Sequence, residues 1–140
     1  MWDSSVPVIE LVMRAPSLED MPQYELPEGY GWRFYRPGDE EIWAQIETSA
    51  GEFEDPADGV KAFDRYSPDR EALKERMIFL TDGGVPFATA TAWFGEGEEG
   101  RLHWVSVDAA HQGRGLSKPL VSLAMHRMRA LGHSSAYLTT

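Results

Sequence analysis

The residues whose types and spacing best predict chemistry lie at 107–118, which read Val-Asp-Ala-Ala-His-Gln-Gly-Arg-Gly-Leu-Ser-Lys. Gly113 and Gly115 free the backbone from side-chain bulk where the chain must turn tightly. A helix that begins directly after the second glycine would add its unpaired N–H groups and the positive end of its dipole. Arg114 and Lys118 bring positive charge to the same place. This stretch is therefore predicted to be an anion-binding turn between a strand and a helix.

The spacing of these residues narrows the choice of anion. A nucleotide P-loop needs G-x-x-x-x-G-K-S/T, which the chain lacks, and a dinucleotide fingerprint needs a third glycine where Lys118 stands. What fits is Gln112-x-x-Gly115-x-Ser117, after a strand that ends at Val107. This pattern resembles the acyl-CoA pyrophosphate loop of the GNAT acetyltransferase superfamily, Gln/Arg-x-x-Gly-x-Gly/Ala, with Ser117 in place of the usual Gly or Ala. A glycine-containing turn that binds no ligand is the alternative interpretation.

The resemblance implies an enzyme that uses acetyl-CoA as its co-substrate. It implies that backbone groups near Val105 and Val107 bind the pantetheine arm and that N–H groups of the loop bind the pyrophosphate. Arg114 and Lys118 would be the side-chain contacts, although both could equally be solvated cations at a helix start. The predicted cofactor-binding residues are Val105, Val107, Gln112, Gly113, Arg114, Gly115, Leu116, Ser117 and Lys118.

Acetyl transfer to an amine needs a group that takes a proton from the amine. His103, on the strand that borders the expected thioester site, is the first candidate because imidazole titrates near neutral pH. It could instead be a core residue that is hydrogen-bonded to its neighbours. Glu52 is the second candidate, with Glu54 and Asp55 beside it, because the loop after the first helix commonly borders the acceptor pocket in the family; these acids could equally be a solvated run. Tyr137 lies within the last strand, so the family's general-acid role is not assigned to it.

Length and composition describe an ordinary globular chain. With 140 residues, 42% of them hydrophobic, it has the size of one domain. The absence of cysteine excludes disulfides and thiolate chemistry, and no metal site is expected. No apolar run approaches the ~20 residues that span a bilayer, and the acidic N-terminus does not look like a signal peptide. We therefore expect a cytoplasmic protein with no membrane partner.

The charge is distributed unevenly along the chain. The net charge is −10, yet all but one of the 23 acidic residues precede Arg101. This imbalance argues against a nucleic-acid partner and fits a local site for a polyanion such as the CoA phosphates. Between residues 39 and 58 there are acidic residues but no Lys or Arg, which would favour a cationic acceptor such as an amine.

The hydrophobic pattern predicts helices and strands around the loop. Asp39 is expected to cap one helix and Ser67 another, while residues 52–66 suit either a short helix or a loop. Within 85–94, Ala88, Ala90 and Ala92 are expected on one face of a strand, opposite Phe87, Thr89, Thr91 and Trp93. The strands are expected at 8–14, 32–36, 77–80, 85–94, 101–107 and 135–140, and the helices at 39–51, 67–76 and 116–131.

This order predicts an α/β (α+β) fold, with a mixed, mainly antiparallel sheet flanked by helices. It is similar to the GNAT core over residues 30–140, preceded by an additional strand and connection at 1–29, in one domain. Family members normally continue into a further helix and a β-hairpin, whereas this sequence stops at Thr140. The last strand is therefore expected to be exposed, which makes a homodimer through it plausible.

The resemblance gives the functional expectation. The chain is expected to be an N-acetyltransferase that moves an acetyl group from acetyl-CoA to an amine of a small molecule or a protein. A non-catalytic acyl-CoA-binding sensor or assembly module of the same fold is the alternative. A domain whose loop binds some other phosphate is a third.

Overall fold

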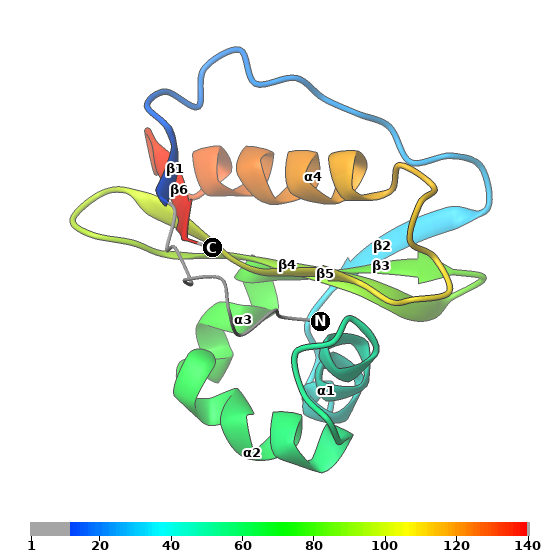
Figure 1. Cartoon of the computed structure of the whole chain (residues 1–140). Helices are drawn as coiled ribbons and strands as arrows, with labels where there is room; N and C mark the ends of the chain where they lie inside the picture. The colour runs from blue at the N-terminus through cyan, green and yellow to red at the C-terminus, as the bar shows by residue number, and fades with distance from the viewer. Residues whose placement is uncertain (1–11, 140) are drawn as a thin grey trace, which may run out of the picture.

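A computed structural model describes residues 12–139 and shows one sheet between two helical layers (Figure 1). The single helix α4 covers one face, while α1, α2 and α3 cover the other. The expected mixed α/β architecture is thus confirmed. The elements are β1 (Val12–Ala15), β2 (Tyr30–Phe34), α1 (Glu40–Ser49), α2 (Pro56–Tyr66), α3 (Arg70–Arg76), β3 (Met77–Asp82), β4 (Val85–Phe94), β5 (Gly100–Val107), α4 (Ser117–Ala130) and β6 (Ala136–Thr139).

The sheet has six strands in the order β1-β6-β5-β4-β3-β2. Every neighbouring pair is antiparallel except β5 and β6. The β3–β4 hairpin turns at Gly83 and Gly84, whose φ angles of 57° and 86° suit the two-residue turn that Asp-Gly-Gly predicts. The parallel β5–β6 pair is joined by α4, so the loop at 108–116 lies at the end of β5 where the chain leaves the sheet.

The core is divided by the sheet. Ala88, Ala90 and Ala92 of β4 are buried with the apolar stripe of α4, as the alanine pattern predicts. Phe87 was expected on the opposite face but joins this same cluster. The reason is a β-bulge, because Leu80 pairs with Ala88 while Thr81 pairs with Pro86, which leaves Phe87 as the extra residue.

Of the two expected helix caps, Asp39 does occupy the N-cap position of α1, whereas Ser67 does not begin a helix. The carboxylate of Asp39 makes no capping hydrogen bond to α1 and instead accepts hydrogen bonds from the Arg33 side chain and from the backbone N–H of Arg36. Ser67 ends α2, and α3 is capped by Asp69, which accepts from the N–H of Ala72. The region that suited either a helix or a loop forms α2, with Asp55 as its cap and proline at its first position.

The last strand is not an exposed edge, contrary to the expectation. All four residues of β6 pair with β1, so β1 forms the edge of the sheet on this side. The first half of the strand expected at 8–14 lies outside the described residues, and its second half belongs to β1. Strand β1 is therefore the neighbour of β6 that the sequence pattern did not predict. Because β6 is paired, the reason for expecting a dimer through an unpaired last strand no longer holds. None of the described helices is both long and apolar enough to cross a bilayer.

Candidate functional site

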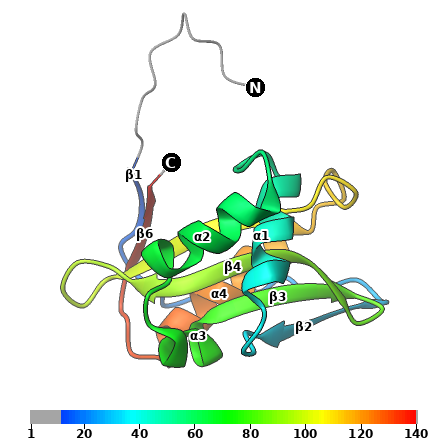
Figure 2. The same cartoon turned by 90° about the horizontal axis from the view of Figure 1, so that it is seen from below.

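The edge of β5 is open beside the loop. β6 pairs with β5 only at Gly100 and Arg101, and then runs in a different direction (Figure 2). Among the described residues, the backbone of β5 from Leu102 to Val107 consequently has no strand partner on this side. Its N–H and C=O groups can bind an extended ligand in the way that a neighbouring strand would.

A second irregularity bends β5 in the middle of this open edge. Thr89 pairs with Ser106 and Thr91 pairs with His103. Between these two pairs the chain advances three residues along β5 but only two along β4, which makes a bulge in β5. At this bulge Trp104 has a φ of 48°, a conformation that costs a residue other than glycine about 1–3 kcal/mol. Its ring offsets part of this cost by packing against the rings of Trp43, Phe53 and Tyr66, with centroid distances of 5.3, 5.9 and 4.6 Å. Strain of this kind is typical of functional sites.

The loop after β5 presents a row of free backbone donors. Within residues 12–139, the N–H groups of residues 112–118 make no hydrogen bond to a backbone or side-chain acceptor. Gly113 and Gly115 have φ angles of 80° and 72°, and a Cβ atom at either position would meet no heavy atom within 4 Å. The backbone conformation, not a lack of space, therefore favours glycine at both positions. The unpaired donors meet at the N-terminus of α4, where the helix dipole also favours an anion.

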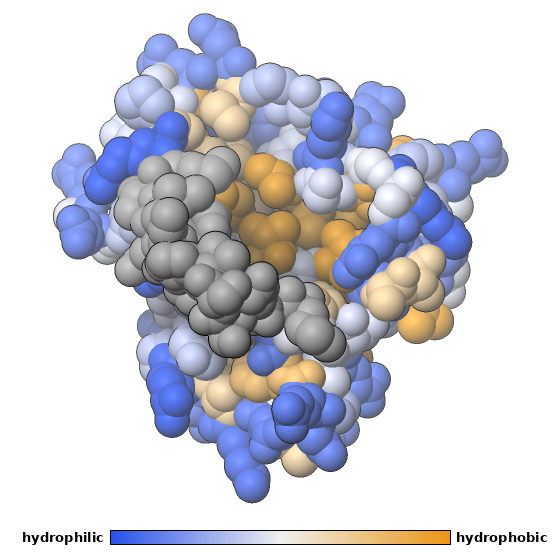
Figure 3. All heavy atoms as spheres, in the orientation of Figure 1, coloured by the Kyte–Doolittle hydropathy of each residue, from blue (hydrophilic) through white to orange (hydrophobic). Residues whose placement is uncertain are grey.

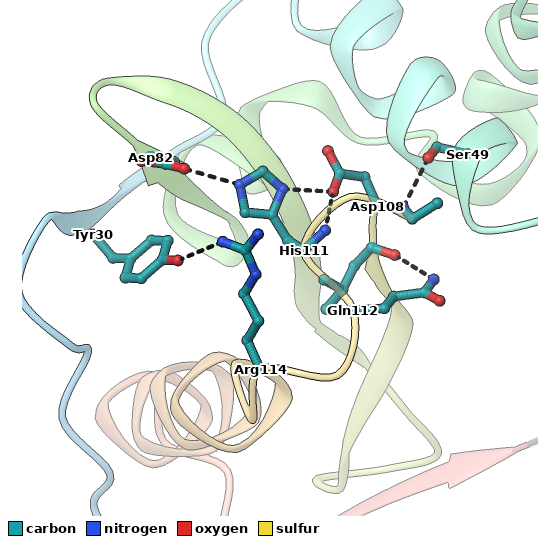
Figure 4. A network of polar contacts seen from close by, with 9 residues as sticks. Tyr30, Ser49, Asp82, Asp108, His111, Gln112 and Arg114 are labelled. Carbon is teal, nitrogen blue, oxygen red and sulfur yellow. Dashed lines mark hydrogen bonds and ion pairs between the residues drawn. The ribbon is translucent and has the colours of Figure 1, made fainter.

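Hydrogen bonds to residues of neighbouring elements hold this loop in place (Figure 4). The side-chain amide of Gln112 donates to the backbone oxygen of Val107 at 2.9 Å, and the N–H of Ala109 donates to Ser49 Oγ at 2.9 Å. The Arg114 guanidinium donates to the Tyr30 hydroxyl at 3.2 Å. The Gln112 side chain thus fixes the turn, which leaves its backbone N–H for a ligand.

His111 connects the loop to the β3–β4 hairpin. Its Nδ1 lies 2.7 Å from Asp108 Oδ1 and its Nε2 lies 2.9 Å from Asp82 Oδ2, while its ring stacks on Phe87 at 4.0 Å between centroids. The hydrogen bond with Asp82, followed by that with Asp108, raises the pKa of His111 against the opposing effect of desolvation. This clamp was not predicted from the sequence, because His111 and Asp82 are 29 positions apart.

The charge at the start of α4 is unusual for a helix N-terminus. Its first turn contains no acidic residue and includes the exposed Lys118. A cation at this end opposes the helix dipole, which favours anions here by about 0.3–1 kcal/mol. An anion that contacts both Lys118 and the helix end would remove this conflict. The exposed Arg114 adds a second cation on the same loop.

An apolar groove runs along α4 from the diverging strands to this loop. A cavity of about 190 Å³ lies between Leu102 of β5, Leu138 of β6 and Met125 of α4. A second, of about 310 Å³, shares Met125 with it and extends to Ser117 and Lys118. Figure 3 shows hydrophobic residues gathered on this face of the molecule. A ligand with an extended arm and a phosphate group fits this combination of an open strand edge, an apolar groove and free N–H donors.

The two predicted catalytic residues differ in their surroundings. His103 is 8% exposed, its Nε2 lies 2.9 Å from the backbone oxygen of Tyr66, and burial lowers its pKa to about 4. It is thus neutral at neutral pH and has the contacts of a hydrogen-bonded core residue, so its role as a base stays a prediction. Glu52 is exposed just after α1, and its N–H donates to the backbone oxygen of Glu47.

Glu47 is a further candidate that was not predicted from the sequence. Its side chain is fully buried, with Oε2 accepting a hydrogen bond from Ser106 Oγ at 2.7 Å and Oε1 without a partner among the described residues. Burial raises the pKa of Glu47 to about 8, and the charge of nearby Glu52 adds to the increase. The sequence does contain a pattern that could have indicated its burial, because Glu47 follows Trp43 by four residues and therefore lies on the same face of the helix.

The comparisons with known proteins agree with the fold. The model of the Acetyltransferase (GNAT) family matches residues 30–140. A search of curated proteins finds no significant match to the chain.

Solved structures share the fold at low sequence identity. A GCN5-related N-acetyltransferase from Sphaerobacter thermophilus is 21% identical, with a TM-score of 0.76, over 94% of this chain and 42% of its own. A GNAT family acetyltransferase from Brucella melitensis, solved in complex with acetyl-CoA, is 20% identical, with a TM-score of 0.61, over 78% of this chain and 74% of its own. The ribosomal-protein-S18-alanine N-acetyltransferase from Escherichia coli is 21% identical, with a TM-score of 0.63, over 78% of this chain and 65% of its own. The chain spans less than half of the length of several of the structures it matches.

Proposed function

Because the chain belongs to the GNAT acetyltransferase family, we propose that it transfers an acetyl group from acetyl-CoA to an amine of a small molecule or a protein. The observation that carries the proposal is the row of N–H groups at residues 112–118 that have no partner within residues 12–139, next to the edge of β5 that is open in the same part of the chain. A loop with this geometry binds phosphate through its backbone. The adjoining apolar groove suits the pantetheine arm.

Each part of the site has a task in this proposal. The N–H groups of residues 112–118 hold the pyrophosphate, with Arg114 and Lys118 balancing its charge. The backbone of Val105 and Val107 binds the arm along β5 and fixes its position. When bound, acetyl-CoA supplies a thioester carbonyl that a neutral amine can attack. The amine must therefore lose a proton before it reacts.

We propose that the acceptor amine is cationic before it reacts. Glu52, Glu54, Asp55 and Asp58 are exposed around the junction of α1 and α2, and none of them forms an ion pair among the described residues. Such a group of unneutralised carboxylates attracts a positively charged acceptor.

The proposal is tested by binding and by turnover. Acetyl-CoA and CoA should each raise the melting temperature, because a ligand that binds only the folded state stabilises it by mass action. ATP should have little effect. Mixing the chain with acetyl-CoA and a panel of amines should release free thiol. Binding of acetyl-CoA without thiol release from any amine would support a sensor or assembly module instead, and stabilisation by ATP alone would contradict acyl-CoA binding.

A further inference from the structure

A buried acid lies on the opposite side of the sheet from the apolar groove. Glu47 of α1 is fully buried and is held by one hydrogen bond, which Ser106 Oγ donates to its Oε2 at 2.7 Å. Its other oxygen, Oε1, has no partner among the described residues. Isolated buried carboxyl groups are costly, so their presence needs a physical explanation.

Two neighbouring residues also have a buried polar atom without a partner among the described residues. Thr89 faces Ser106 across β4 and β5, and its Oγ1 is buried without a partner in the described chain. Trp43 lies one helical turn before Glu47, and its Nε1 is also buried without a hydrogen-bond partner in the described chain. Most buried polar groups are hydrogen-bonded, so several unpaired groups around one carboxyl mark a place where polarity is retained at a cost to stability.

Ser106 connects this buried layer to the candidate site. It lies between Val105 and Val107 on β5, the strand whose outer edge is open. Because its hydroxyl hydrogen points at Glu47, its lone pairs can accept a hydrogen bond from another donor. A donor placed at Ser106 would therefore be linked to a carboxyl group through a single hydroxyl.

We propose that Ser106 and Glu47 form a proton relay that takes the proton from the amine substrate of the transfer reaction. The proposal rests on the proposed function. The ammonium gives one proton to Ser106 Oγ while the hydroxyl proton of Ser106 moves to Glu47 Oε2. The products are a neutral amine, an unchanged serine and a protonated Glu47, so protons and charge balance.

The surroundings of Glu47 match it to this task. With a pKa of about 8, its carboxylate is a better proton acceptor for an ammonium than an ordinary carboxylate or than His103, whose pKa is lowered to about 4. Glu52 is the charged residue whose field acts on Glu47, and it raises the pKa further. The groups that β4 and β5 present here, Thr89 and Ser106, do not titrate in this range.

The test is the pH profile of kcat with an amine that the wild-type chain acetylates. For the wild type, kcat should rise with a limb near pH 8 as Glu47 ionises. Glu47→Gln should lower kcat by about 100-fold or more, within the range for general base catalysis. The limb near pH 8 should disappear, while the KM for acetyl-CoA stays within about twofold. Glu71→Gln, an exposed acid on α3 outside the acidic run at 39–58, is the matched control and should leave the profile unchanged.

Ser106 provides an independent test that does not alter the buried acid. Ser106→Ala should lower kcat and retain the binding of acetyl-CoA, and Ser106→Thr, which keeps the hydroxyl, should recover most of the rate. An active wild type whose Glu47→Gln variant keeps the same kcat and the same limb would overturn the relay alone. A wild type that binds acetyl-CoA but acetylates no amine would overturn the proposed function and the relay together.

Discussion

The two halves of the candidate site are built in different ways. The loop at 112–118 uses the backbone of consecutive residues, whereas the Glu47–Ser106 pair joins side chains that are 59 positions apart. The first depends on two glycine conformations and on a helix start, which are local properties of the chain. The second exists only because α1 packs on the sheet beside β5. Function that resides in backbone donors is thus encoded locally, while function that resides in buried side chains is encoded by the fold.

The largest expected effect is on the backbone half. Gly115→Glu should abolish acetyl-CoA binding, with at least a 100-fold loss of affinity by calorimetry. The substitution brings a negative charge to the proposed phosphate-binding loop and puts a residue with a side chain at a positive φ angle. Gly97→Glu is the matched control, since Gly97 also has a positive φ and no neighbour within 4 Å of a Cβ atom, but lies in the β4–β5 turn. Both variants should lose about 1 kcal/mol of stability, and only the first should lose binding. Equal affinities for the two variants would contradict the assignment of the loop.

For the Glu47–Ser106 pair, the expected effect is a change in how the free energy of unfolding depends on pH. The pKa of Glu47 is raised from 4.5 to about 8 by burial, so the folded state binds the proton more tightly than the unfolded state. The free energy of unfolding of the wild type should therefore fall as the pH rises from about 4.5 to 8, by an amount on the order of 1.4 kcal/mol per unit of pKa difference. In Glu47→Gln this component should be missing, so the variant should be the more stable protein at pH 8. Denaturation by urea across this range measures the difference, and parallel curves for the two proteins would show that Glu47 is not buried as an acid.

The smallest expected effect concerns the clamp between loop and hairpin. The hydrogen bonds that His111 donates to Asp82 and Asp108 raise its pKa, so its contribution to stability is full below the unfolded value of 6.5 and is lost as the pH rises through the higher folded value. His111→Gln should remove this pH-dependent contribution, about 1 kcal/mol for a partly exposed ionic contact. The difference in unfolding free energy between the two proteins should thus be larger at pH 5.5 than at pH 9. A difference that is independent of pH would mean that the carboxylates do not hold a charged His111.

The same difference between local features and contacts made by the fold decides what could be predicted from the sequence. The position of the loop, the succession of most helices and strands along the chain and the alanine face of β4 were predicted, because each depends on short spacings or on a period of two. The bulges at Phe87 and Trp104 were not, since the register of a pair depends on both strands. The pairing of β6 with β1 was missed because it joins segments from the two ends of the sequence.

The position of the candidate site could be predicted from the sequence in part for the same reason. The residues proposed to bind acetyl-CoA are consecutive or lie on one strand, and the structure brings them together around an open edge and a row of free donors. Glu47 stood in an acidic run that looked solvated, and only its packing distinguishes it from Glu52. Neighbouring acids in a sequence differ in chemistry when one of them is buried.

The most direct test of the central claim is a titration of the ¹⁵N-labelled chain with CoA, followed by amide chemical shifts. If the backbone of the loop holds the pyrophosphate, the largest changes should occur at the N–H groups of residues 112–118, followed by those of Val105 and Val107 on β5. Saturable binding whose largest changes lie elsewhere, with the loop amides unmoved, would contradict the account.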